Sequence, residues 1–122
     1  MVEERITDGE RIAQLLASEV TGRTDGPLGR LAVENADREV EPTVDGARAY
    51  DLERDRDAFA AVFVQPDRVR MELREGIEDA VEAAEREGLR VRPKATRPPR
   101  TLVFVESGAE VKRAVAVLAD AV

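Results

Sequence analysis

Residues 58–74 read AFAAVFVQPDRVRMELR, and this stretch decides the fold class. Its first seven residues are apolar on both faces of an extended chain, which is typical of a central strand. Its last seven alternate valine, methionine and leucine with charged side chains, which is typical of a strand with one buried face. The Gln-Pro-Asp between the two halves favours a tight turn. The stretch therefore predicts a β-hairpin inside an antiparallel sheet.

Four shorter strands are expected around this hairpin. Before it, residues 31–33 and 50–52 alternate larger apolar side chains with small or charged ones. After it, residues 89–91 and 101–105 are short, mainly apolar runs. Three prolines lie in the connection 92–100, and because proline cannot donate to a ladder we expect no regular strand pairing there.

Three helices are expected from apolar residues at helical spacing. They cover residues 8–20, residues 77–87 and a last segment that begins at Ser107. Thr7 and Ser107 are each followed three residues later by Glu, which predicts a capping box at the start of the first and last helix.

The order of elements is helix, four strands, helix, two strands and helix. Segregated runs of this kind predict an α+β fold, with an antiparallel sheet of about five to six strands and the helices packed mainly on one face. A length of 122 residues fits one domain, residues 1–122, with a single core.

The composition excludes several kinds of chemistry. The chain has 26 Asp and Glu against 19 Lys and Arg, a net charge of -7, and no Cys, His or Trp. Disulfides, thiolate nucleophiles, zinc-thiolate sites and the commonest general base are therefore absent. We predict a non-enzymatic interaction protein without cofactor or metal. A small enzyme that uses only arginines and carboxylates is the alternative.

The cellular environment is predicted from the same composition. Residues 1–14 are charged where a signal peptide needs an apolar run, and no segment approaches the roughly 20 apolar residues of a membrane helix, so we expect a cytoplasmic protein without a membrane partner. Among the cations only Lys94 and Lys112 are lysine. An acidic composition that prefers arginine is typical of proteins in high salt; a G+C-rich genome is the alternative explanation.

One segment, residues 86–100, is strongly basic in this acidic chain. It has a single acid, Glu87, and six candidate anion-binding residues: Arg86, Arg90, Arg92, Lys94, Arg97 and Arg100. Arginine offers a planar fork of donors, so the segment predicts an anionic ligand or a nucleic-acid backbone as a partner. The alternative is a solvated strand face whose arginines pair with neighbouring acids.

The aromatic residues argue against stacking on nucleic-acid bases. All four lie in expected strands, where an aromatic is more often part of the core, and none lies in the basic segment. They are Tyr50, Phe59, Phe63 and Phe104.

The middle helix has an acidic face that could bind Mg²⁺ or Ca²⁺, although such a face is usually only solvated, and we predict no metal site there. Its carboxylates are Glu75, Glu78, Asp79, Glu82 and Glu85.

The strand 58–64 also suggests a homo-oligomer. Helices on one side of a sheet leave its other face uncovered, and this strand is apolar on both faces, so a second copy of the chain could cover it. The alternative is that the N-terminal helix covers it within the chain.

The two ends of the chain resemble a known family. The stretches MVEERITDGERIAQLLASEV, residues 1–20, and GLRVRPKATRPPRTLVFVESGAEVKRAVAVL, residues 88–118, are similar to small uncharacterised proteins from halophilic archaea. The resemblance implies a cytoplasm with high salt and no known activity.

Overall fold

The structure is a computed structural model that describes residues 7–122. The helices are α1 (Gly9–Gly22), α2 (Ile77–Glu87) and α3 (Val111–Ala121). The strands are β1 (Leu31–Glu34), β2 (Ala47–Arg54), β3 (Asp57–Gln65), β4 (Arg68–Leu73), β5 (Val91–Lys94) and β6 (Arg100–Val105). They form one six-stranded sheet in the order β1-β2-β3-β4-β6-β5, and all neighbours are antiparallel. The predicted α+β fold is confirmed.

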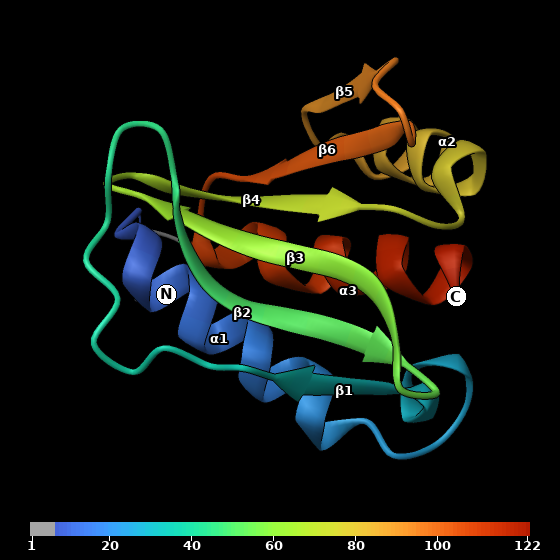
Figure 1. The fold of residues 1–122 in the computed structure, drawn as a ribbon, viewed down its shortest axis with the longest axis horizontal. Helices are drawn as coiled ribbons and strands as arrows, with labels where there is room; N and C mark the ends of the chain where they lie inside the picture. Colours follow the sequence, from blue (N-terminus) through green and yellow to red (C-terminus); the bar gives the residue numbers. More distant parts are fainter. Residues whose placement is uncertain (1–6) are drawn as a thin grey trace.

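The helices form a second layer behind the sheet. In Figure 1 the sheet is in front and α1 and α3 cross behind its central strands. The helix α2 contacts α3, β5 and β6, so it covers the same side at the other end of the sheet. The opposite face of the sheet, which we call the open face, has no helix over it (Figure 1).

The central strand β4 shows why the helices cover one face only. Val69, Met71 and Leu73 are fully buried and belong to the core that contains Ile12, Leu16 and Leu118 from the helices. Successive side chains of a strand point to opposite faces, so the charged residues between them point to the open face. The predicted hairpin of β3 and β4 is confirmed, with Gln65 opposite Arg68 across the turn.

The predicted helix caps are partly wrong. The N-cap of α1 is Asp8 rather than Thr7, because the Asp8 carboxylate accepts hydrogen bonds from the backbone nitrogens of Glu10 and Arg11 at 2.9 and 3.3 Å. A carboxylate at a helix N-terminus is also favoured by the helix dipole.

At the last helix, Ser107 precedes a 3₁₀ turn, Gly108–Glu110, and its side chain makes no capping hydrogen bond. The Glu110 carboxylate instead accepts from the backbone nitrogen of Glu106 at 2.7 Å, one residue before the predicted cap, so the predicted capping box does not form and α3 begins at Val111.

The prediction that prolines prevent pairing in residues 92–100 is wrong at both ends of this connection. Arg92, Pro93 and Lys94 pair with β6, and Arg100 belongs to β6 as the partner of Lys94. The backbone carbonyl of Arg90 accepts a hydrogen bond from the backbone nitrogen of Phe104 at 2.9 Å. Because the direction of the backbone groups alternates along a strand, Arg92 and Lys94 also direct theirs to β6, whereas the nitrogen of Pro93 faces solvent. A proline at that place costs no ladder bond and protects the sheet edge from pairing with another chain.

Candidate functional site

The open face carries a row in which arginine and phenylalanine alternate. The strand register places five outward side chains next to one another, which we call the Arg–Phe row: Arg48, Phe63, Arg70, Phe104 and Arg90. They come from β2, β3, β4, β6 and the residue before β5. Segments far apart in the sequence thus meet in one line across the sheet.

The arginines of this row cover the aromatic rings. The guanidinium carbon of Arg70 lies 4.7 Å from the ring centroid of Phe63, and that of Arg90 lies 5.5 Å from the ring centroid of Phe104. These are cation–π distances. Both rings are half-buried, so their outward surfaces lie under charged side chains of the same chain.

A second row lies beside the first and supports it. Its members are Asp51, Ala61, Glu72, Leu102 and Arg92. Ala61 is 3% exposed and Leu102 is 8% exposed although no helix covers them, so the longer side chains around them exclude water.

Glu72 of the second row pairs with two arginines, Arg70 of the Arg–Phe row and Arg100 at the start of β6. Its Oε2 accepts from Nε of Arg70 at 2.8 Å, and its Oε1 accepts from Nη1 of Arg100 at 3.0 Å. The Glu72 side chain is only 13% exposed, so this pairing is partly shielded from solvent. Nε of Arg100 is buried and has no hydrogen-bond partner within residues 7–122. One carboxylate is therefore shared by two guanidinium groups.

The structure brings three of the six predicted anion-binding residues together on the open face at the β5 edge. Arg90, Arg92 and Lys94 alternate along the chain, so they share one face of the edge strand, and all three are exposed. We call these three residues the basic edge. Arg90 has only a distant ion pair, 3.9 Å to Glu106, whereas Arg92 and Lys94 have none within the described part of the chain.

The other three predicted anion-binding residues lie outside the basic edge. Arg97 lies exposed in the connection between β5 and β6, and it makes no ion pair with any described residue. Arg100 is half-buried and paired with Glu72. Arg86 belongs to the helix layer, where it pairs with Asp120 of α3, so it does not contribute to the basic edge.

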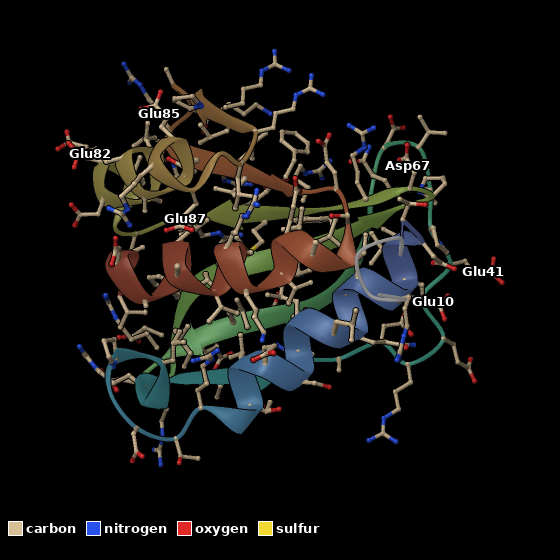
Figure 2. All side chains as sticks on the ribbon, turned by 180° about the vertical axis from the view of Figure 1, so that it is seen from behind. Glu10, Glu41, Asp67, Glu82, Glu85 and Glu87 are labelled. Carbon is tan, nitrogen blue, oxygen red and sulfur yellow. The ribbon has the colours of Figure 1, made fainter. Side chains whose placement is uncertain are left out.

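The helix α2 carries exposed carboxylates on the helix side of the sheet. Figure 2, which views the molecule from behind, shows Glu82 and Glu85 projecting outward from α2. Both are exposed, and Glu75 pairs with Arg54. Within residues 7–122 no three acidic side chains lie close enough together to hold a metal ion. The exposed carboxylates of α2 and the basic edge therefore lie on opposite faces of the sheet.

The comparison with known families bears on the chain as a whole. The model of a family of unknown function, DUF7993, matches residues 1–122. The chain belongs to this family. It matches no curated protein and no solved structure. Membership in DUF7993 confirms the predicted resemblance to uncharacterised proteins, whereas the high-salt origin stays a prediction. No helix in the described part of this DUF7993 chain is long and apolar enough to cross a membrane.

Electrostatics within this DUF7993 chain favour ionised carboxylates. For Asp51, partial burial acts to raise the pKa, but hydrogen bonds from Asn35 and Arg48 and the charges of Arg48 and Arg74 outweigh it and lower the pKa. Hydrogen bonding by a neighbouring arginine also lowers the pKa of Asp55 and Asp67. A lowered pKa is the opposite of what a general acid at neutral pH needs.

A cavity of about 350 Å³ lies away from the open face, between α1 and the connection that follows β1. It is lined mainly by apolar atoms and includes Tyr50. The Tyr50 hydroxyl donates to the backbone carbonyl of Ala13 at 2.8 Å, and burial raises its pKa, so it remains a protonated structural donor. The charged residues in the cavity's lining are Glu10, Asp37 and Arg38, so it lacks the group of cations that forms the basic edge.

The Arg–Phe row was not predicted from the sequence. The phenylalanines were expected in the core, which holds for Phe59 but not for Phe63 and Phe104. No aromatic residue lies within the basic segment of the sequence, although Arg90 of that segment lies over Phe104 in the fold. The two-residue turn could have placed Phe63 opposite Arg70 by counting back along the hairpin.

Proposed function

We propose that the protein is a non-enzymatic interaction protein that binds an anionic partner at the basic edge of its open face. This proposal is supported by the exposure of Arg90, Arg92 and Lys94 on one face of an edge strand. In a protein of net charge -7, Arg92 and Lys94 have no described carboxylate as an ion-pair partner, and Arg90 has only the distant one of Glu106.

Arginine supports this function through its geometry. A guanidinium presents a rigid fork of donors that matches two oxygens of a phosphate or carboxylate. The neighbouring strand also supports the basic edge, because Phe104 and Leu102 of β6 are the cross-strand neighbours of Arg90 and Arg92. A partner therefore meets cations on a strand whose backbone is already ordered, and this lowers the entropy lost on binding.

A non-enzymatic role is supported by the available chemistry. The chain has no His or Cys to act as base or nucleophile. The pKa of Asp51, a carboxyl group of the open face, is lowered by arginines and not raised. Binding needs neither an acid nor a nucleophile.

The same proposal includes function in high salt. At about 1 M salt the Debye length is about 3 Å, so long-range attraction is lost and only groups in contact with the partner contribute. Folding itself should improve, because screening relieves repulsion among the carboxylates. A melting temperature that does not rise between dilute buffer and molar salt would contradict this part of the proposal.

The test is a binding titration with two anionic polymers, inorganic polyphosphate and a fluorescent single-stranded oligonucleotide, at low and at molar salt. The variant replaces the three residues of the basic edge, Arg90, Arg92 and Lys94, by Gln. We expect it to bind both polymers at least about tenfold more weakly at low salt. For the single strand, each lost phosphate contact should reduce the slope of log affinity against log salt by about 0.7.

The matched control neutralises three cations on the helix side, Arg23, Lys112 and Arg113, so its change in net charge is the same. We expect this control to bind nearly as tightly as the unchanged protein. Equal losses in the two variants would mean that only net charge matters and would contradict the proposed site. No binding of either polymer at low salt would contradict the proposed function.

A homo-oligomer stays a prediction, but the uncovered apolar face of β3 no longer supports it. The outward side of β3 was expected to need a second copy, yet Arg70 covers Phe63 within the chain. Strand pairing between copies is also disfavoured at β5, where Pro93 faces solvent. Light scattering that gives a monomer mass at low and at molar salt would contradict the oligomer.

A further inference from the structure

We infer that the anionic partner is a single-stranded nucleic acid whose bases stack on Phe104 and Phe63. This inference rests on the proposed function and identifies the partner at the same face. Arg90 and Arg70 now cover the two rings. When a strand binds, these guanidinium groups turn from the rings to its phosphates, and bases take their places.

The placement of the two rings suits an extended chain. Phe63 and Phe104 lie in the same row, separated by β4. Strands in a sheet are spaced by about 4.8 Å, so the two positions are about 10 Å apart. Both belong to ordered strands, and the cations Arg90, Arg70 and Arg48 flank them in turn. A single strand that runs across the sheet therefore meets aromatic rings and phosphate-binding groups alternately.

The arginines that cover the two rings are not held equally firmly. Arg90 is 66% exposed and has only the 3.9 Å ion pair with Glu106 besides its ring contact. Arg70 is 16% exposed, donates from Nε to Glu72 and donates from Nη1 to the backbone carbonyl of Asp45 at 3.0 Å. Moving Arg70 therefore disrupts more bonds. Phe104 should contribute more to binding than Phe63.

The chemistry distinguishes a single strand from other polyanions. Polyphosphate offers phosphates but no π-face, and a duplex keeps its bases stacked inside. Exposed bases of any kind can stack on an aromatic ring, and stacking does not depend on long-range charge. It therefore persists in the high salt proposed above, where steering by charge is lost.

The first experiment changes only the ligand. An oligonucleotide of about 12 nucleotides, within the range that small single-strand-binding folds cover, is compared with an abasic strand of the same length. Both have the same phosphates. We expect the unchanged protein to bind the abasic strand about fivefold or more weakly, at low and at molar salt. Equal affinities would overturn the inference without reference to the folding of any variant.

The second experiment changes the rings. Phe104→Leu and Phe63→Leu keep an apolar side chain under the arginines and remove the π-face. We expect Phe104→Leu to weaken binding of the single strand about fivefold and Phe63→Leu to weaken it less, and we expect each variant to weaken polyphosphate binding less than single-strand binding. The control is Phe59→Leu. It also removes a ring that an arginine contacts, because the guanidinium carbon of Arg54 lies 5.4 Å from the Phe59 ring centroid. The Phe59 side chain, however, is fully buried in the core. Thermal melting confirms that each variant is folded.

The outcomes separate the two proposals. If polyphosphate and single strands bind, the triple Gln variant weakens both, and Phe104→Leu weakens neither, the basic edge stands and stacking is refuted. If no anionic polymer binds, both proposals fail. Binding of a duplex as tightly as the single strand would also overturn the inference, because its bases cannot reach the rings.

Discussion

The two faces of the sheet are built from the same strands but by different physical means. On β4, Val69, Met71 and Leu73 face the helices and are fully buried among apolar side chains. Arg70 and Glu72, between them, face outward and pair with each other. Burial of apolar area is non-directional and holds the helix side together. The open face is covered by ion pairs and cation–π contacts, which can be exchanged for contacts with a partner at low cost.

The largest expected effect contrasts neighbouring residues on the two faces. Met71→Ala leaves a cavity in the core and should lower the free energy of unfolding by about 2–5 kcal/mol. Arg70→Met keeps an unbranched side chain over Phe63 and should cost only about 1 kcal/mol. Urea unfolding of both variants measures the difference. Equal losses would mean that the open face contributes as much to stability as the core does.

The second effect tests how closely the helix layer approaches the sheet. A Cβ at Gly9 of α1 would lie 1.9 Å from the backbone oxygen of Gln65, so the chain must shift, and Gly9→Ala should destabilise by about 1–3 kcal/mol. Gly22→Ala is the control in the same helix. Its Cβ meets nothing within 4 Å, so it should stabilise by about 0.5–1 kcal/mol. Thermal unfolding should move in opposite directions for the two variants; a shift in the same direction would argue against this close contact.

A smaller effect concerns the contact between Arg70 and Phe63. In a double-mutant cycle with Arg70→Met and Phe63→Leu, the coupling energy should be about 0.5–1 kcal/mol in favour of the pair. It is measured by urea unfolding at low salt. A coupling near zero would mean that the arginine covers the ring without stabilising it.

The smallest expected effect is the change in stability with pH that Asp51 causes. The pKa of Asp51 is lowered on folding, so its contribution to stability is present above the ordinary value of 3.8 and is lost as the pH falls through the lowered value. Asp51→Asn should therefore be less stable than the unchanged protein at neutral pH, and the difference should shrink in acid. Unfolding curves from neutral pH to below the ordinary value test this. A difference that grows in acid would show that the sign is wrong.

The helix side could be predicted from the sequence because its signal is local. The alternation of Val69, Met71 and Leu73 identifies the buried face of β4 without knowledge of its neighbours. The bounds of α2 follow from its apolar stripe and from Gly88, which takes a positive φ of 74° as the C-cap.

The open face could be predicted only in part, because its contacts depend on strand order. The turn after Gln65 determines that Phe63 lies opposite Arg70. That Phe104 lies on the other side of Arg70 requires β6 to pair with β4 and β5 to lie at the edge, and no periodicity specifies this order. The basic segment was recognised by composition, but composition could not separate Arg86, which pairs with α3, from the residues of the basic edge.

Binding of an anionic partner at the basic edge can be followed residue by residue. The backbone amide resonances of the isotope-labelled protein are recorded during a titration with inorganic polyphosphate. We expect shifts concentrated on β5, β6 and the connection between them, with few on the helices. Shifts concentrated on α1, α2 and α3, or no shifts at low salt, would contradict it.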